Sequence, residues 1–281
     1  MRAVPQSRDA VHNPAAAAFC VAVRSLKEKL EMTETLSGKT AFVTGATSGV
    51  GEALVKELLD RGVGSVIATG RKAEALEALT AIAPNQIITS EFDLANLDQI
   101  PEFMSRFTVD LAFLNAGVYH RKPLLEQNLA DWERVHAINV TAPTFIAQAV
   151  LPHMIEQGDG AIVFTASMAG LNAYPGLGLY GGGKAMIIKL MQDIALSYGP
   201  KGVLCNAGCP GYIDTPMLHE AIREMAPSFG MSYDEMLALI SKENSIKRLL
   251  TPEEVAAGLV DLALPGRGLC GVAQPMGNTH G

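Results

Sequence analysis

One stretch near the start of the chain reads Thr40-Ala41-Phe42-Val43-Thr44-Gly45-Ala46-Thr47-Ser48-Gly49-Val50-Gly51. Its first five residues are apolar or β-branched, a pattern typical of a buried strand. Glycine lets a backbone turn tightly and approach a ligand without a Cβ clash. Because the glycines also open a helical segment at 49–61, the free N–H groups of a helix N-terminus add a second anion-binding feature. The sequence therefore predicts a strand, a turn and a helix that together cradle the phosphates of a dinucleotide.

Segments with strand and helix patterns alternate from Gly38 onward. Strands are expected at 40–44, 65–69, 86–91, 109–114, 161–166 and 203–207. Helices are expected at 49–61, 72–82, 127–156 and 179–198, the third of them as one long helix. Residues 161–164 are continuously apolar, as in a parallel strand that is covered on both faces. The alternation predicts an α/β fold with a doubly wound parallel sheet in a single domain.

The chain divides into an N-terminal extension, 1–36, and one domain, 37–281. Residues 212–250 interrupt the alternation, and we expect them to form two short helices. A further helix is expected to begin at Pro252, with Thr251 as its N-cap. An insertion that follows the carboxyl end of a strand is positioned as a substrate lid.

The extension contains a nine-residue apolar run at 15–23 behind two arginines, which resembles part of a signal peptide. Asp9 and the Asn13-Pro14 pair weaken that interpretation. We therefore expect a poorly ordered tail, or an upstream extension with Met32 as the natural start, and keep a targeting peptide as the alternative.

The composition excludes several classes of protein. The chain has 281 residues, of which 48% are hydrophobic and 18% charged, so it can bury a large core. Its formal net charge is -7 and it has no basic run, which argues against a nucleic-acid partner. No apolar stretch reaches the ~18 residues that span a membrane. The four cysteines lack zinc-ligand spacing, so we expect no metal site and interpret them as buried thiols of a reducing, cytoplasmic compartment: Cys20, Cys205, Cys209 and Cys270.

The second expected strand is followed by Gly70-Arg71-Lys72, where a carboxylate would bind ribose hydroxyls and favour NAD. Arg71 instead offers a guanidinium suited to a 2′-phosphate, so we expect NADP(H) to be favoured over NAD(H). The alternative is that Arg71 and Lys72 begin a solvated helix. Asp93, after the third strand, is expected to bind the adenine amino group or to cap the next helix.

Tyr180 and Lys184 are one helical turn apart, so they share a face. A phenol ordinarily has a pKa near ~10, and a neighbouring ammonium group is expected to lower the pKa of Tyr180 toward neutrality. Ser167, at the end of the fifth strand, is placed to donate a hydrogen bond to a substrate oxygen. Asn139, in the long helix, is expected to hold a water or a helix kink near Lys184. This set of groups suits proton transfer to or from a carbonyl oxygen.

The series of motifs resembles the short-chain dehydrogenase/reductase family over about 36–271. The matching residues are Thr44-Gly45-Ala46-Thr47-Ser48-Gly49-Val50-Gly51, Asn115-Ala116-Gly117, Asn139, Ser167, Tyr180, Lys184 and Pro210-Gly211. The resemblance implies a Rossmann-type domain, a catalytic set of Asn139, Ser167, Tyr180 and Lys184, and a homodimer or homotetramer. It also implies that Asn115-Ala116-Gly117 stabilises the sheet, and that Thr215 and its neighbours line a nicotinamide ring. The expected cofactor-binding residues are then Gly45, Thr47, Ser48, Gly49, Val50, Gly51, Arg71, Asp93, Leu94, Asn115, Ala116, Gly117, Tyr180, Lys184, Pro210, Gly211, Ile213 and Thr215.

Two segments depart from the family pattern. Gly181-Gly182-Gly183 lies between the tyrosine and the lysine, where small residues such as serine and alanine are more usual. Three glycines cost a helix ~2–3 kcal/mol relative to alanine, so we expect a loosened helix start or a partner backbone packed closely there. The segment 274–281 lacks the usual acidic residue before paired glycines, which makes the last strand and its oligomer contacts less well defined.

The preferred function is hydride transfer between NADP(H) and a small to medium, largely apolar ketone or secondary alcohol. The expected substrate-binding residues are Ser167, Met168, Tyr174, Tyr180, Tyr212 and Met217. One alternative is a 3-hydroxyacid dehydrogenase, with the substrate carboxylate held by His219, Arg223 or Lys242. A 3-oxoacyl-carrier-protein reductase is another, although it would need a basic docking patch. A non-catalytic dinucleotide-binding sensor or scaffold is the alternative from a different class.

Overall fold

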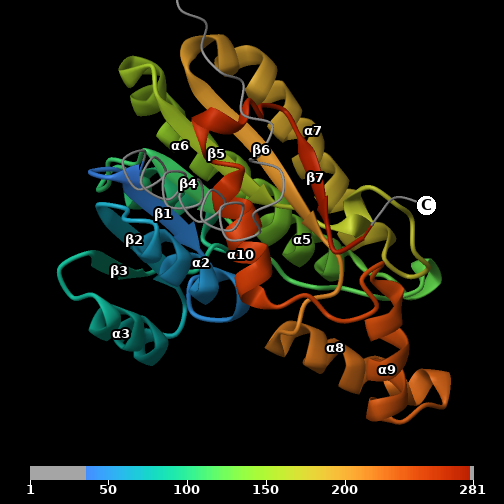
Figure 1. Cartoon of the computed structure of the whole chain (residues 1–281). Coiled ribbons are helices and arrows are strands. Elements are labelled where there is room, and N and C mark those ends of the chain that lie inside the picture. Colours follow the sequence, from blue (N-terminus) through green and yellow to red (C-terminus); the bar gives the residue numbers. More distant parts are fainter. Residues whose placement is uncertain (1–35, 279–281) are drawn as a thin grey trace, which may run out of the picture.

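The computed structural model describes residues 36–278, and a seven-stranded parallel sheet forms its centre (Figure 1). The strands run in the order β3-β2-β1-β4-β5-β6-β7. Their bounds are β1 (Thr40–Thr44), β2 (Ser65–Gly70), β3 (Ile87–Glu91), β4 (Leu111–Leu114), β5 (Gly160–Thr165), β6 (Val203–Pro210) and β7 (Ala273–Met276). Every neighbouring pair is parallel, so the carboxyl ends of all seven strands meet at one edge of the sheet.

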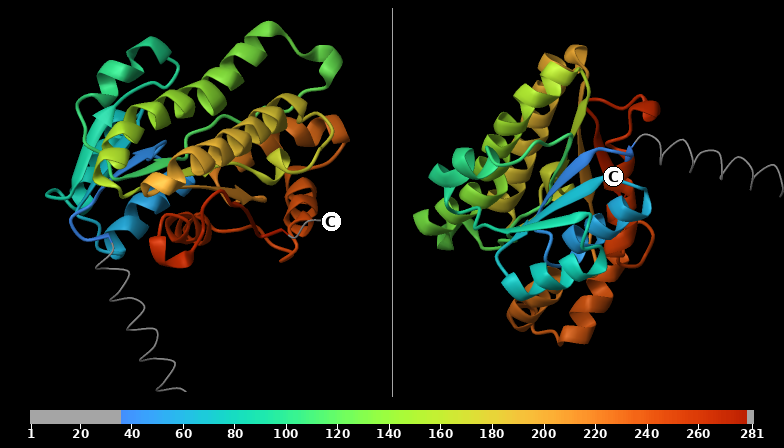
Figure 2. Two further views of the ribbon diagram at one scale, coloured as in Figure 1. Left: turned by 90° about the horizontal axis from the view of Figure 1, so that it is seen from above. Right: turned by 90° about the vertical axis from the view of Figure 1, so that its left-hand side faces the viewer.

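Helices cover both faces of the sheet, as Figure 2 shows. One face carries α2 (Gly49–Asp60), α3 (Ala73–Ile82) and α10 (Pro252–Asp261). The other carries α4 (Ile100–Met104), α6 (Ala142–Gln157) and α7 (Gly178–Tyr198). This arrangement confirms the doubly wound parallel sheet predicted from the alternation of strands and helices.

Successive residues of each strand belong to two separate cores. In β1, Phe42 packs with the α4, α6 and α7 core, whereas Ala41 and Val43 pack with the α2 and α10 core. Phe42 is completely buried, and burial of such a side chain contributes ~1.5–3 kcal/mol. The continuous apolar runs in the sequence therefore reflect strands that are buried on both faces.

The expected elements are present, with one internal change. The segment 127–156 is not one regular helix: α5 (Leu129–His136) passes through a π-helical turn, Ala137–Thr141, into α6. Asn128 caps α5 in a capping box with Asp131, which sets its start. The last strand, β7, is also formed, because it pairs with the extended carboxyl half of β6.

The segment 212–250 contains the two short helices expected of the lid, α8 (Pro216–Met225) and α9 (Tyr233–Glu243). They lie side by side in Figure 1 and share a small core of their own, which includes Ile222 and Met236. After the lid, Thr251 caps α10 by accepting a hydrogen bond from the Glu254 N–H at 3.2 Å, as predicted. The segment 212–250, for which we keep the name lid, is thus a packed unit joined to the end of β6.

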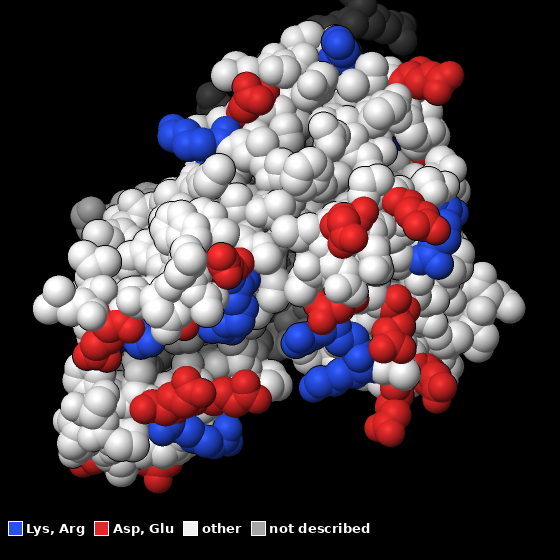
Figure 3. All heavy atoms as spheres, turned by 180° about the vertical axis from the view of Figure 1, so that it is seen from behind, with Lys and Arg blue, Asp and Glu red and all other residues white. Residues whose placement is uncertain are grey.

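The structure also bears on what we expected of the N-terminal extension, the cysteines and the surface. The proposals for 1–35 lie outside the described residues, whereas Leu36 is buried in the core. Cys205 and Cys209 are buried as expected, but the expectation is wrong for Cys270, which is exposed. Within 36–278, no helix is long and apolar enough to cross a membrane, and no cluster of three metal-ligating side chains occurs. On the face shown in Figure 3, acidic and basic side chains are interspersed rather than gathered by sign.

Helix α7 begins at Gly178 and continues through all three glycines, so the expected loosening of its start is not observed. Close backbone packing is present, but the same chain supplies it rather than the partner backbone that we considered. A Cβ on Gly181 would lie 2.5 Å from the Ala169 carbonyl oxygen, whereas a Cβ on Gly182 would meet nothing within 4 Å. The absence of a side chain at Gly181 therefore permits a close contact between α7 and the preceding loop, whereas Gly182 takes part in no such contact.

These neighbouring glycines provide a matched stability test. Gly181→Ala should lower the free energy of unfolding by ~1–3 kcal/mol, because the new methyl group collides with backbone. Gly182→Ala should raise it by ~0.5–1 kcal/mol, because alanine favours the helix and has open space. Urea unfolding of both variants measures the difference, and equal effects would show that the contact at Ala169 carries no constraint.

Candidate active site

The turn between β1 and α2 has the geometry of an anion-binding cradle. Gly51 lies so close to the preceding turn that an added Cβ would be only 2.0 Å from the Gly45 carbonyl oxygen. Ser48, the N-cap of α2, makes no capping hydrogen bond with its side chain. The N-terminus of a twelve-residue helix therefore combines with a turn that excludes side chains, and this arrangement fits a pyrophosphate.

The cradle is packed against the end of β2. The Ala46 N–H donates to the Thr69 carbonyl at 2.9 Å, and a Cβ on Gly70 would lie 2.5 Å from Thr47 Cγ2. Arg71 follows directly and is exposed. Arg71 therefore follows directly on the end of β2 that packs against the cradle, at the position expected from the sequence.

The segment after β3 offers fewer side-chain groups to a cofactor than expected. Asp93 Oδ1 accepts a hydrogen bond from the Ala95 N–H at 3.0 Å, so its carboxylate stabilises a local turn. Leu94 is buried in the core, which leaves only its backbone available to a ligand. The expectation that Asp93 caps the next helix is wrong, because Asn96 is the N-cap of that helix and the Asp93 carboxylate bonds within the turn before it.

Asn115 joins three neighbouring strands. Its backbone N–H donates to Thr44 Oγ1 at 3.0 Å, and its side-chain Nδ2 donates to the Thr44 carbonyl at 3.2 Å. Its Oδ1 accepts from Thr165 Oγ1 at 3.3 Å. The ends of β1, β4 and β5 are therefore fixed relative to one another, which is the role that the resemblance implied.

Asn139 has a specific structural role that the sequence did not define. Its Oδ1 accepts from the Val118 N–H at 2.8 Å, and its Nδ2 donates to the Val118 carbonyl at 2.9 Å. The side chain is buried and belongs to the π-helical turn. Such turns occur frequently at functional sites. The expected helix irregularity is thus present, and it fixes the loop that follows β4.

Tyr180 and Ser167 are the candidate proton-handling pair, and they lie together in the structure. Burial raises the pKa of Tyr180 above its ordinary value, and a hydrogen bond with Ser167 acts in the opposite direction. Lys184 does not provide the expected lowering: its Nζ lies 5.8 Å from the centre of the Tyr180 ring and donates to the Thr165 carbonyl at 2.6 Å. The expectation that the ammonium group acidifies the phenol is therefore wrong for this state of the site, because burial dominates.

Lys184 is itself almost completely buried, at 5% exposure. Burial lowers its pKa to about 8, while the nearby Cys209 thiol acts weakly in the opposite direction. The Cys209 thiol responds to the same environment, because burial raises its pKa to about 11. Lys184 can therefore change its charge close to neutral pH.

Further tyrosines gather around Tyr180. The Tyr119 ring lies 5.4 Å from the Tyr180 ring, centre to centre. Burial raises the pKa of Tyr212 to about 12, and Tyr119 and Tyr174 add to this shift, which places the three phenols near one another. Tyr174 and Tyr212 were expected here, whereas Tyr119 was missed. Its position immediately after Asn115-Ala116-Gly117, at the carboxyl end of β4, is the signal that could have identified it.

The remaining candidate substrate-binding residues differ in burial and in their side-chain partners. Met168 is buried beside Ser167, whereas Met217 is 44% exposed on α8. His219 is engaged by Asp214 at 2.7 Å and by Tyr233, and the exposed Arg223 guanidinium lies over the Tyr233 ring at 5.6 Å.

The segment after β6 connects the cradle to the lid. The Gly211 N–H donates to the Met276 carbonyl at 3.0 Å, which extends the pairing with β7 beyond Pro210. Ile213 forms an isolated parallel bridge with Leu250. Thr215 caps α8, and its Cγ2 would be 3.1 Å from a Cβ on Gly49. The start of the lid therefore lies against the cradle.

Asn244, which the sequence did not indicate, holds the same segment. It is completely buried, its Oδ1 accepts from the Tyr212 N–H at 3.0 Å, and its Nδ2 donates to the Tyr212 carbonyl at 2.9 Å. An asparagine in a polar lid sequence carries no special pattern, so only the structure reveals this contact.

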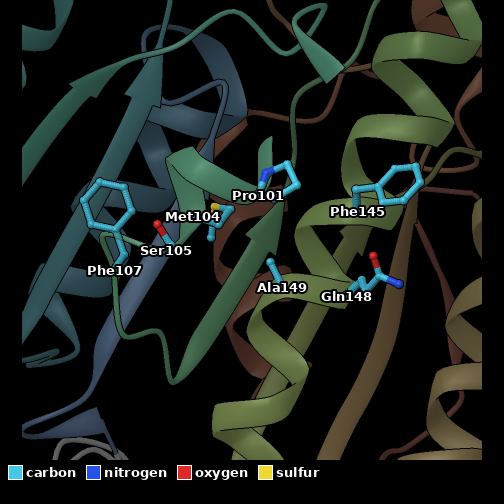
Figure 4. A pocket seen from close by; sticks show the side chains of 7 residues that line it. All are labelled: Pro101, Met104, Ser105, Phe107, Phe145, Gln148 and Ala149. Atoms are coloured by element: carbon cyan, nitrogen blue, oxygen red, sulfur yellow. The ribbon is translucent and has the colours of Figure 1, made fainter. Parts of the chain in front are cut away.

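A separate shallow pocket of about 330 Å³ lies between α4 and α6 (Figure 4). Its lining includes Met104, Phe107 and Phe145. None of the candidate catalytic or cofactor-binding residues lines it, so it is distinct from the site described above.

The buried lysine has a measurable consequence for stability. Because the pKa of Lys184 is about 8 in the fold, against an ordinary value of 10.5, the unfolded state holds more protons between these values. Stability from this group therefore rises as pH increases from 8 toward 10.5. Lys184→Met should melt at a higher temperature than the wild type at pH 7, and the gap should narrow at pH 10. A lower melting temperature at pH 7, or a constant gap, would contradict this assignment.

The comparisons with known proteins agree with this geometry. The family model described as short chain dehydrogenase matches residues 39–226. A 2-keto-3-deoxy-L-fuconate dehydrogenase of Xanthomonas campestris pv. campestris is 33% identical, over 81% of this chain and 75% of its own. A cis-4-hydroxycyclohexanecarboxylate dehydrogenase of Sinomonas cyclohexanicum is 32% identical, over 83% of this chain and 92% of its own.

A solved structure of a variant actinorhodin polyketide ketoreductase with NADPH superposes with a TM-score of 0.80 at 26% identity, over 85% of this chain and 95% of the other. The sheet, the glycine-rich cradle and the Ser167–Tyr180–Lys184 arrangement thus coincide with a family match over most of the domain. The chain belongs to the short-chain dehydrogenase family and is an oxidoreductase of the type that acts on alcohol and ketone groups.

Proposed function

We propose that this protein transfers a hydride between NADP(H) and a ketone or secondary-alcohol substrate. The observation that carries this proposal is the Tyr180 phenol, which is paired with Ser167 and lies one helical turn from the buried Lys184. When bound, the nicotinamide supplies the hydride acceptor or donor. The remaining chemistry is the movement of one proton at the substrate oxygen, and this chain's residues are arranged to perform it.

Tyr180 acts as the acid in reduction and as the base in oxidation. Its raised pKa keeps the phenol protonated at neutral pH, which suits proton donation to a carbonyl oxygen. Ser167 positions that oxygen by donating a second hydrogen bond. Lys184 is held by Thr165 at the end of β5, where its ammonium group is available to ribose hydroxyls. Asn139 acts through the backbone of Val118 and is a positioning residue.

The preference for NADP(H) rests on Arg71. The residue is exposed directly after β2, next to a cradle whose Thr47 packs on Gly70. A guanidinium group can pair with a 2′-phosphate in a bidentate manner, and no acidic residue occupies the end of this strand. The similar polyketide ketoreductase structure contains NADPH, which is consistent with this choice.

A hydroxyacid dehydrogenase is the second candidate. Both relatives described above are named for substrates that carry a carboxylate. The tyrosines around Tyr180 provide an aromatic pocket wall for either substrate class. An acyl-carrier-protein reductase would need a basic docking patch, and on the face shown in Figure 3 the basic side chains lie among acidic ones.

We also propose that the protein is a cytoplasmic homodimer or homotetramer. Large apolar side chains are exposed on α5, α6 and α7, among them Trp132 at 52% and Met186 at 53%. Exposed apolar surface on long helices is suited to contact with a second copy. Light scattering should give a mass of two or four chains, and a monomeric mass at micromolar concentration would contradict this assembly.

The catalytic assignment is tested by Tyr180→Phe. Removing the hydroxyl should reduce kcat for ketone reduction by at least ~10²-fold, because the proton donor is lost. NADPH binding, followed by fluorescence enhancement, should stay close to that of the wild type. If the wild type binds NADPH but turns over no member of a broad ketone and alcohol panel, the sensor alternative is supported instead.

The cofactor assignment is tested by Arg71→Asp. The change replaces a group that attracts the 2′-phosphate by one that repels it and can bind ribose hydroxyls. The ratio of kcat/KM for NADPH to that for NADH should fall by ~10²-fold or more. Lys72→Asp, at the next exposed position, is the matched control and should have a smaller effect. An unchanged ratio in Arg71→Asp would remove this residue from the cofactor site.

A further inference from the structure

The loop after β4 carries a half-buried arginine that the proposed mechanism does not use. Asn139 fixes this loop at Val118, and Tyr119 follows with its ring against the Tyr180 ring. Arg121 lies two residues further along. The loop therefore extends from the catalytic phenol toward this guanidinium group.

The stem of Arg121 crosses to the loop that precedes α7. The Lys122 N–H donates to the Gly176 carbonyl at 2.9 Å, which joins the two loops. A Cβ on Gly176 would lie 3.2 Å from Arg121 Cγ, so the stem rests against the backbone there. The position of Arg121 is thus defined by two loops that both border Tyr180.

The guanidinium end of Arg121 reaches the lid. Its Nη1 donates to Met225 Sδ at 3.3 Å, and its central carbon lies 5.5 Å from the Phe229 ring centre. Thioether sulfur is a weak acceptor, and an aromatic face is a partial substitute for an anion. The lid therefore covers the cation without neutralising it.

No Asp or Glu among residues 36–278 forms an ion pair with Arg121. Asp131, on the helix after this loop, pairs with Lys122 at 3.0 Å, and Glu243, which acts on Tyr212 through its charge, forms no ion pair with Arg121 in the described part of the chain. A partly desolvated cation is costly unless an anion or several hydrogen bonds satisfy it. The fork of a guanidinium group is well matched to a carboxylate, so a ligand is the natural partner.

Arg121 belongs to the same cleft as the tyrosines. Burial raises the pKa of Tyr119, and Arg121 opposes this shift through its charge and a hydrogen bond to the phenol oxygen. Arg121 also opposes the raised pKa of Tyr212, which lies on the lid side. Tyr119 therefore stands between the catalytic phenol and the cation, in contact with both.

We propose that Arg121 determines substrate specificity by binding a carboxylate at the end of the substrate remote from the reacting carbonyl. Tyr119, which already accepts a hydrogen bond from Arg121, donates its own hydroxyl to the same carboxylate. This inference rests on the proposed oxidoreductase function. A carboxylate bound to Arg121 would make the enzyme favour oxo acids and hydroxy acids over neutral ketones and alcohols. Arg121 then takes the role of carboxylate-binding residue that the sequence analysis gave to His219, Arg223 or Lys242.

The test compares acids with their uncharged esters. Reduction with NADPH is measured for 3-oxobutanoate, 4-oxopentanoate and 5-oxohexanoate, each against its methyl ester. The wild type should prefer at least one acid over its ester. Arg121→Met should lower kcat/KM for that acid by ~10- to 100-fold, mainly through KM, and leave the ester nearly unchanged. The kcat/KM of Arg121→Lys for the acid should lie between those of the wild type and Arg121→Met, because lysine keeps the charge but lacks the planar fork of the guanidinium group.

Arg223→Met is the matched control, since this exposed lid arginine lies over Tyr233, and it should retain the acid preference. If Arg121→Met does not fold, inhibition of ester reduction by the wild type provides a second measurement: pentanoate should compete and pentanamide should not. A wild type that prefers every ester, or an Arg121→Met variant that loses acid and ester turnover equally, overturns the role of Arg121 while leaving the oxidoreductase function intact. Absence of turnover with every acid and ester, in both redox directions, overturns the oxidoreductase function and this inference together.

Discussion

The site depends on one continuous set of hydrogen bonds across the carboxyl edge of the sheet. Thr44 is bonded to Asn115, Asn115 to Thr165, and Thr165 to the Lys184 ammonium group. The first member ends the strand that leads into the cradle, and the last lies on the helix that carries Tyr180. Because these links are continuous and partly buried, the distance between the cradle and the proton-transfer groups is fixed by the sheet itself.

Much of this arrangement could be predicted from residue patterns. Parallel strands are buried on both faces, so a run such as Ala161–Phe164 identifies a strand by its composition alone. The Gly45–Gly51 turn could be recognised from its glycines. The backbone at Gly51 lies so close to that at Gly45 that no Cβ fits between them, so only glycine is tolerated there. The spacing of Tyr180 and Lys184 likewise required only helical periodicity.

The remainder could not be predicted, because it depends on how loops meet. Helical spacing placed Lys184 on the same face as Tyr180, but the lysine's hydrogen bond goes to a strand carbonyl, and burial rather than charge sets the direction of the pKa of Tyr180. Tyr119 and Arg121 acquire their roles only when three separate segments converge on them. No periodicity in the sequence records that convergence.

The π-helical turn at Ala137–Thr141 also constrains how this chain can change in evolution. A π-helical turn contains one residue more than the α-helical turn that would replace it. Loss of a single residue there would restore a regular helix between α5 and α6 and rotate Asn139 away from Val118. Such a deletion would keep every residue that touches substrate or cofactor, yet it would release the loop that presents Tyr119. Descendants of this protein are therefore free to vary the surface of this helix far more readily than its length.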